Sequence, residues 1–227
     1  MTRTHYFFTT FLPALPALGE APPLSLRELA SRAEDWPDLA EVVGAVLLEH
    51  DLLQRQSVLL GQPLQGVPAV LTAEQVRGEA PLPEHLQAEH SQAHPIVEDA
   101  TWQTYFRYVA SVARRHGSDF LRRWVGFEVA LRNALVLARA KTLRLNPEEY
   151  LVATELADEQ ADVAEAVTRW TAAGDPLSAQ RVLDEARWQW LSENGGWFTF
   201  QTDEAASYAR GLVLSHRWHQ MKNNCKL

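Results

Sequence analysis

The sequence is poor in the residues and motifs that carry redox chemistry or phosphate binding. Its one cysteine, Cys225, lies near the C-terminus and has no internal disulfide partner, so we expect a reducing, cytoplasmic location. No G-x-x-x-x-G-K-[ST] or G-x-G-x-x-G motif is present. Gly61 and Gly66 have the first motif's spacing, but Val67 follows where a phosphate-binding lysine is needed. We therefore expect a chain that does not hydrolyse ATP and needs no cofactor.

Long apolar runs and net positive charge are missing too. No uninterrupted apolar stretch approaches the roughly 20 residues that cross a bilayer, and Pro13 and Pro16 interrupt the apolar N-terminal stretch. The formal net charge of -8 argues against general binding to nucleic acid. The 46% of apolar residues in a chain of 227 is enough for a substantial core. We expect a soluble or peripheral protein without direct membrane insertion.

The strongest pattern in the sequence predicts a long helix over residues 119–144. Large apolar side chains recur there at steps of three and four residues, which places them on one face of an α-helix. These are Phe120, Trp124, Phe127, Leu131, Leu135 and Ala138. That face must be buried.

The same helix carries most of the chain's basic character. Residues 103–144 hold nine arginines and lysines against two acids, a net charge of +7, which leaves -15 for the rest of the chain. The split predicts a basic surface that meets an acidic one, either within the protein or on a partner.

Capping signals predict the other helices. Ser25 with Glu28 is a capping box for a helix over 26–33, and Asp35 and Pro37 open a second helix that continues toward Leu60. Further helices are expected over 99–117, 150–170, 176–194 and 203–221. The helix over 150–170 is acidic, and Asn146-Pro147 supply the cap and the proline that precede it.

The fold class is therefore predicted to be all-α, an irregular array of roughly seven or eight helices. Residues 5–11 are aromatic and β-branched, and we expect a short extended segment there. The chain divides into an N-terminal part (1–60), a connector rich in proline and glycine that holds short helical turns (61–98), and a C-terminal helical part (99–227). The whole is expected to form one unit.

The best metal-binding candidate is the group His85, His90 and His94 in the connector. His90 and His94 are four residues apart, a spacing that places two imidazoles on one helix face. The group lacks the H-E-x-x-H order and lies in a polar, proline-rich stretch, so we favour a solvated segment with scattered histidines over a metal site.

Arg132 and Asn133 interrupt an otherwise apolar passage and need hydrogen-bond partners if they are buried. A structural reading gives them an interhelical bond or a salt bridge to the acidic helix. A functional reading makes them part of a partner-binding face on the basic helix.

Two stretches resemble known families. His5-Tyr6-Phe7-Phe8, Phe11-Leu12-Pro13, Pro22-Pro23-Leu24-Ser25 and Glu28-Leu29 resemble the opening of DUF2764, a bacterial family of unknown function associated with V-type ATP synthase operons. Trp124, Phe127-Glu128, Leu131-Arg132-Asn133 and Arg139-Ala140-Lys141 resemble a helix of the V/A-type ATPase C (d) subunit, an all-helical socket between the membrane rotor ring and the central shaft.

The resemblance implies a non-catalytic subunit or accessory protein, C-like, that couples the central stalk of a V-type ATP synthase to its membrane rotor ring. Its partners would be those stalk and rotor subunits, on the cytoplasmic face of the membrane. The predicted interaction residues are Arg122, Arg123, Arg132, Asn133, Arg139 and Lys141. The alternatives are a helical metal-dependent enzyme that uses His85, His90 and His94, and a general helical adaptor.

Overall fold

The computed structural model describes residues 5–87, 95–196 and 199–224. Most of these residues are in helices. No strand occurs among these residues, so the predicted all-α class is confirmed. The α-helices are α1 (Tyr6–Thr10), α2 (Leu26–Ala33), α3 (Pro37–Leu59), α4 (Ala73–Arg77), α5 (Val97–His116), α6 (Asp119–Leu143), α7 (Ala164–Ala172), α8 (Pro176–Asn194) and α9 (Thr202–Asn224). Three short 3₁₀ turns are η1 (Glu84–Leu86), η2 (Pro147–Glu149) and η3 (Thr154–Leu156).

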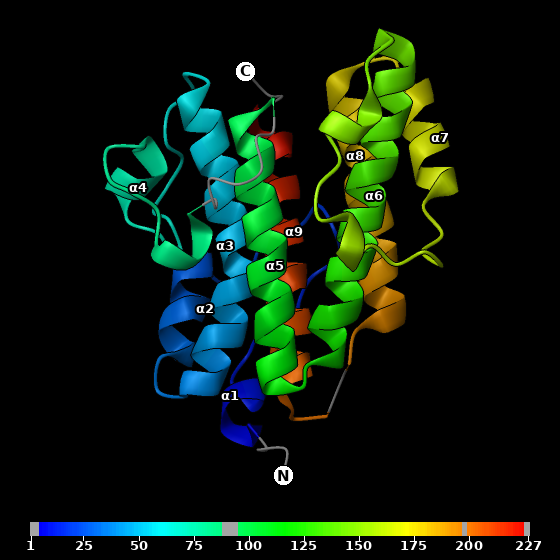
Figure 1. Cartoon of the computed structure of the whole chain (residues 1–227). Coiled ribbons are helices and arrows are strands. Elements are labelled where there is room, and N and C mark those ends of the chain that lie inside the picture. The colour runs from blue at the N-terminus through cyan, green and yellow to red at the C-terminus, as the bar shows by residue number, and fades with distance from the viewer. Residues whose placement is uncertain (1–4, 88–94, 197–198, 225–227) are drawn as a thin grey trace.

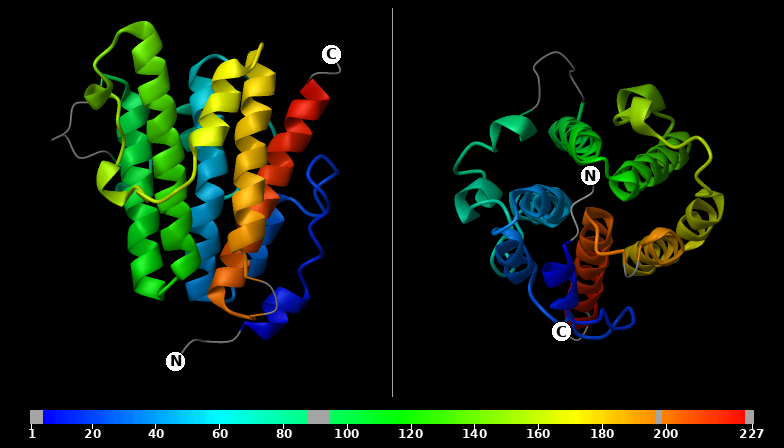
Figure 2. Two further views of the ribbon diagram at one scale, coloured as in Figure 1. Left: turned by 90° about the vertical axis from the view of Figure 1, so that its right-hand side faces the viewer. Right: turned by 90° about the horizontal axis from the view of Figure 1, so that it is seen from below.

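Five long helices stand side by side in a ring, as the view along the bundle shows (Figure 2). Helix α3 packs against α5, α5 against α6, α8 against α9, and α9 closes the ring against α3. Helix α7 packs outside the ring on α6 and α8, and α2 and α4 cover α3. The chain reverses direction between successive long helices, so α3, α6 and α9 end at the same pole at which α5 and α8 begin (Figure 1).

Capping residues at the junction of α5 and α6 position these helices. Ser118 accepts a hydrogen bond from the backbone N–H of Leu121 at the start of α6, and Gly117 closes α5 with a φ of +61°. Asp203 in the first turn of α9 accepts from the backbone N–H of Phe120 (3.1 Å) and bonds the Ser118 hydroxyl. Because a left-handed residue is inexpensive only as glycine, Gly117 allows α5 and α6 to reverse within two residues.

Two apolar cores lie side by side in the bundle. The larger core joins α2, α3, α5, α9 and one side of α6, and the smaller core contains Phe127, Leu131, Ala166 and Leu183 from α6, α7 and α8. The larger core combines residues from the N-terminal and C-terminal parts of the chain. Helix α6 contributes residues to both cores, so part of its surface lies at the boundary between them.

The connector is held on α3 by one buried carboxylate. Asp51 is fully buried and accepts hydrogen bonds from the backbone N–H groups of Ala69, Val70 and Leu71, at 2.7–2.9 Å. A Thr72–Gln75 capping box follows directly at the start of α4. The carboxylate thus satisfies three backbone donors that the irregular connector would otherwise leave unpaired.

The extended segment expected over residues 5–11 is wrong, because residues 6–10 form the helix α1. The hydroxyls of Thr9 and Thr10 donate back to the carbonyls of His5 and Tyr6, at 3.1 and 2.8 Å. Phe8 is buried with its ring 5.9 Å from that of Trp36. Packing against α3 therefore overrides the β propensity of the aromatic and β-branched residues.

The acidic helix expected over residues 150–170 is also wrong. Only residues 164–172 are α-helical, and residues 150–163, which include the short turn η3, form an otherwise irregular strap across α5 and α6. Asn133 donates to the Val152 carbonyl (2.9 Å) and accepts from the Val152 N–H (3.0 Å), while the Asp158 N–H donates to the Gly126 carbonyl (3.1 Å). Because these backbone groups of the strap bond to α6, they are not available for hydrogen bonds within a helix formed by the strap itself.

We expect Asn133→Ala to loosen this strap. The variant removes both bonds to Val152, and leaving that buried backbone unpaired should cost about 2 kcal/mol of unfolding free energy. Hydrogen exchange of residues 150–158 should accelerate while that of α9 stays slow. Gln189→Ala, an exposed change on α8, is the control and should leave the strap's exchange unchanged. Equal exchange in both variants would contradict the role of Asn133.

Candidate functional site

Six charged side chains meet in the middle of the bundle, where the two apolar cores adjoin. They come from four helices: Glu49 from α3, Glu128 from α6, Asp184 and Arg187 from α8, and Arg210 and Arg217 from α9. Glu128 lies between Phe127 of the smaller core and Val129 of the larger one. The junction between the cores is therefore polar.

The six groups form a closed ring of alternating charge. Arg210 donates to Glu49 (2.5 Å) and Glu128 (2.7 Å), and Arg187 donates to Glu128 (2.8 Å) and Asp184 (3.3 Å). Arg217 closes the ring by donating to Asp184 (3.0 Å) and Glu49 (2.9 Å). Each carboxylate thus has two arginine partners and each arginine has two carboxylates. We call these six residues the charge ring.

The charge ring is neutral as a whole and nearly dry. Glu49, Glu128, Asp184 and Arg210 are each at most 5% exposed. Burial alone would raise the pKa of Glu128, but the positive charges of Arg187 and Arg210 outweigh it and lower that pKa to about 2. Burial disfavours charged Arg210 as well, yet Glu49 and Glu128 raise its pKa. Glu128 and Arg210 are therefore charged at neutral pH.

The charge ring fixes how the helices face one another. Fork-like guanidinium bonds to carboxylates are directional, so the ring sets both the distance and the rotation of α3, α6, α8 and α9. The Arg210 guanidinium also lies 4.7 Å from the ring centroid of Trp124, which adds a cation–π contact from α6.

A cleft of about 350 Å³ lies directly beside the charge ring. Glu49, Glu128, Arg187 and Arg217 form its polar floor, and Arg132 forms part of its wall. The remaining wall is mostly apolar: Leu53, Trp102, Phe106, Leu135, Leu183 and Met221 line it, together with Gln180, whose amide donates to Asp184. Glu128 and Arg187 lie near the middle of α6 and α8. Most of the other lining residues lie in the second halves of α3, α6 and α9 or the first halves of α5 and α8, so the cleft extends toward the pole where the C-terminus is drawn (Figure 1).

Exposed aliphatic side chains surround this pole. Leu59 and Leu60 end α3, Val97 begins α5, and Leu143 and Leu145 lie at and beyond the end of α6, each between 44% and 77% exposed. Single exposed apolar residues are ordinary, but these five share the pole toward which the cleft extends, and we treat them together as a candidate protein-binding surface. We call this group the aliphatic rim.

Arg132 is the most open cation of the cleft. Its Nη2 donates to Asp99 (2.8 Å), and the guanidinium lies 5.1 Å from the ring centroid of Trp102. Its Nε is buried without an acceptor among the described residues, and its side chain is 29% exposed. Burial lowers the pKa of Arg132, and the hydrogen bond to Asp99 counteracts part of this effect. The arginine stays charged at pH 7.

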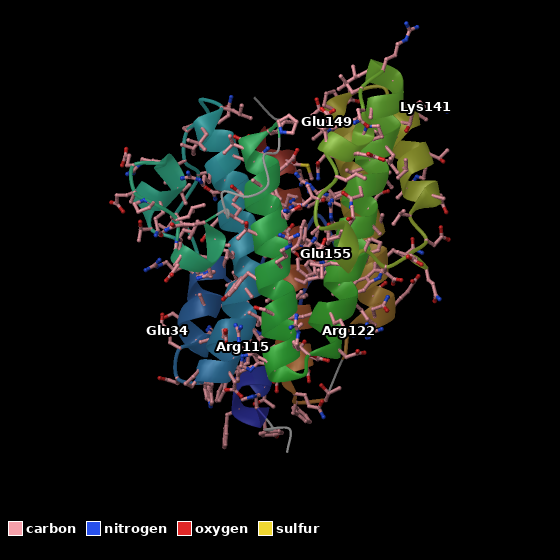
Figure 3. All side chains as sticks on the ribbon, in the orientation of Figure 1. Glu34, Arg115, Arg122, Lys141, Glu149 and Glu155 are labelled. Carbon is pink, nitrogen blue, oxygen red and sulfur yellow. The ribbon has the colours of Figure 1, made fainter. Side chains whose placement is uncertain are left out.

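The structure does not gather the six predicted interaction residues into one patch. Arg122 and Lys141 lie at opposite ends of α6 (Figure 3), roughly 28 Å apart at 1.5 Å per residue. Arg122 and Arg123 pair with Asp119, and Arg123 also donates to Asn194. Arg139 stacks 5.0 Å over Trp170, and Lys141 is exposed without a described partner.

Asn133 and Arg132, although adjacent, have different surroundings. Asn133 is buried and holds the strap, as the structural reading of this residue predicted, although its partner is not an acidic helix. Arg132 binds Asp99 of α5 and lines the cleft. Of the six predicted residues, Arg132 is the one that belongs to the candidate site.

The predicted metal group is described only in part. His85 is exposed with its ring 4.2 Å from that of Tyr108, while His90 and His94 lie outside the described residues. Within the described ranges no cluster of three histidine, cysteine or acidic side chains could hold a metal ion.

Sequence reasoning missed most of the charge ring. Glu49 and Arg210 were not singled out, although both interrupt apolar runs, AVLLEHDLL and YARGLVL. Such an interruption of a buried helix face signals a buried ion pair, because an unpaired charge there is too costly. The signal marks the residues but does not say which ones pair.

The fold and the site define a helical bundle protein with a polar interior and an open cleft at one pole. The model of the family "Protein of unknown function (DUF2764)" matches residues 82–225, which is more than half of the chain. The chain therefore belongs to the DUF2764 family, as the sequence predicted. The match includes α5 to α9, and the N-terminal residues that suggested the family lie outside it.

No curated protein and no solved structure matches the chain. Among the described residues, no helix is both long and apolar enough to cross a membrane.

Proposed function

We propose that this protein is a non-catalytic, C-like subunit or accessory protein of a V-type ATP synthase, which couples the central stalk to the membrane rotor ring. The observation that carries the proposal is the open cleft with its aliphatic rim at one pole of a ring of long helices. A cleft of this kind suits the insertion of a protruding end of a partner. The resemblance of residues 124–141 to the C subunit supports the choice of partner.

The charge ring suits a subunit that transmits force. A coupling subunit must resist rotation of one helix against another when one partner turns. Apolar contacts are non-directional, whereas the arginine–carboxylate bonds between α3, α6, α8 and α9 are not. The charge ring lies next to the cleft floor, where a load applied by an inserted partner would be received.

A second exposed patch lies at the opposite pole. Tyr6, Phe7 and Phe11 are 54%, 71% and 74% exposed on and after α1, and Tyr6 contacts Phe200. Aromatic side chains are enriched at protein interfaces, where their rigid rings contribute large contact areas. We propose that this α1 patch faces the rotor ring while the aliphatic rim faces the stalk.

Pull-down of the tagged full chain from its own cells tests the proposal. The wild type should recover stalk and rotor subunits of a rotary ATPase. Leu60→Glu with Leu143→Glu should lose the stalk subunits at least tenfold, and Phe7→Ser with Phe11→Ser should lose the rotor subunits instead. Because all four side chains are exposed, these variants should remain folded.

Gln189→Glu, an exposed change on α8 away from both poles, is the matched control and should recover both sets of subunits. Recovery of no ATPase subunit by the wild type, from a lysate that contains the intact complex, would overturn the proposal. Equal recovery by all variants would overturn the assignment of the two surfaces.

A further inference from the structure

The cleft contains an arginine whose hydrogen-bonding capacity is largely unused. Of the three nitrogens of Arg132, only Nη2 has an acceptor among the described residues. Nε is enclosed without one, and the 29% exposure of the side chain leaves part of the guanidinium open. The other two arginines of the cleft, Arg187 and Arg217, each already hold two carboxylates.

The acidic groups of the cleft have no comparable free capacity. Glu49 and Glu128 each accept from two arginines of the charge ring. An incoming cation would compete with these guanidinium groups and leave one of them buried without its full set of partners, which is costly. An incoming anion meets Arg132 without displacing any member of the charge ring. The cleft therefore favours an anionic group over a cationic one.

The remainder of the wall selects the body of the ligand. Leu53, Trp102, Phe106, Leu135, Leu183 and Met221 provide apolar surface, and the aliphatic rim continues it at the pole. A volume of about 350 Å³ accommodates one or two side chains, and not a folded element. A planar carboxylate on an apolar polypeptide fits both the guanidinium and this wall.

We propose that the cleft binds an aspartate or glutamate side chain at the apolar end of a partner polypeptide, with Arg132 as the residue that reads the carboxylate. Trp102 supports the guanidinium from one face, and Asp99 fixes it through Nη2. The inference rests on the proposed function in one respect, that the cleft receives a protruding end of a partner. It adds the chemistry of that end.

Binding of three capped peptides to the full-length protein tests this assignment. The probes are acetyl-Leu-Glu-Leu-amide and its counterparts with glutamine and with lysine in the middle. The glutamate peptide should bind at least tenfold more tightly than the glutamine peptide, and the lysine peptide more weakly still. The Arg132 Nε–H resonance, observed by nitrogen-15 NMR, should shift with the glutamate peptide and not with the others.

Arg132→Gln should reduce the glutamate preference to less than twofold. Because this change leaves Asp99 without its partner, the double variant Asp99→Asn with Arg132→Gln serves as a second, charge-balanced test and should show the same loss. Arg139→Gln, which removes a cation on the same helix outside the cleft, is the control and should keep the tenfold preference.

Equal binding of the glutamate and glutamine peptides to the wild type would overturn the inference, as would an unchanged preference in the charge-balanced variant. The outcome is distinguishable from that of the pull-down. ATPase subunits recovered by a protein without glutamate preference would refute the inference alone. A clear glutamate preference in a protein that recovers no ATPase subunit would refute the proposed function and leave the cleft's ligand chemistry standing.

Discussion

Replacing Glu128 by glutamine should lower the free energy of unfolding by about 3 to 5 kcal/mol, the cost of removing one partner from a buried ion pair. Glutamine has nearly the same shape, so the loss arises from charge and not from packing. It leaves Arg187 and Arg210 with one carboxylate each and gives the buried charge ring a net charge of +1. Denaturation in urea, followed by circular dichroism at pH 7, measures the change.

Two further variants make this result specific to the charge ring. Glu155→Gln removes an exposed pair with Arg107 on the same bundle and should cost no more than about 1 kcal/mol. Adding Arg187→Gln to Glu128→Gln restores neutrality, so the double variant should lose clearly less stability than the sum of the two single variants. A Glu128→Gln variant as stable as Glu155→Gln would show that the charge ring does not hold the helices.

The sequence predicted the helices whose ends are set by local chemistry. Ser25, Ser118 and Asp175 each cap a helix through bonds to residues two or three positions on, and such bonds are visible in the spacing of the residues alone. The stretch 119–143 is helical as predicted, since its apolar spacing is regular over the whole length. These features depend on neighbours within one or two turns.

The strap and α1 could not be predicted in this way, because distant residues decide them. Residues 150–163 have the composition of an acidic helix, but Asn133 and Gly126 on α6 take up the backbone groups of Val152 and Asp158. At Gly126 an added Cβ would lie 3.0 Å from the Cβ of Asp158, so only glycine permits this approach without displacement. Neither of these contacts can be recognised from the residues next to it in the sequence.

The basic excess of residues 103–144 finds much of its counterpart inside the protein. Arg107 pairs with Glu155, Arg115 with Glu41, Arg122 with Asp119 and Arg132 with Asp99. The predicted meeting of opposite charges is thus largely intramolecular. What the composition could not reveal is the charge ring, which joins residues as far apart in the sequence as Glu49 and Arg217. Nor could it reveal that Arg132 keeps a buried Nε without an acceptor among the described residues.

Acidification from pH 7 to pH 5 should cost about 2 kcal/mol of unfolding free energy, and His50 should account for most of it. His50 is 8% exposed on α3. Burial, together with the positive charges of His216 and Arg217 on α9, lowers its pKa from 6.5 to about 4. The neutral ring accepts a hydrogen bond from the side chain of Gln54 (2.8 Å), which a protonated ring could not do.

The sign follows from proton counting. Between pH 6.5 and pH 4 the unfolded chain binds a proton at His50 that the native protein does not, so stability falls as the pH falls through this window. Below pH 4 both states are protonated and the full loss, about 3 kcal/mol, is complete. Glu128, with its pKa of about 2 against an ordinary 4.5, adds a second loss only below pH 4.5. The interval from pH 7 to pH 5 therefore isolates the histidines.

Urea denaturation of His50→Gln at pH 7 and pH 5 tests this assignment. Glutamine does not titrate and can still bond Gln54, so most of the pH dependence should vanish. A smaller slope should persist, because burial also lowers the pKa of His216. His85 lies outside the α3–α9 contact and burial lowers its pKa as well, so His85→Gln should reduce the slope by less than His50→Gln does. If His50→Gln lost as much stability between the two pH values as the wild type, the acid sensitivity would have to arise outside the α3–α9 contact, because no other histidine in that contact has its pKa lowered as far.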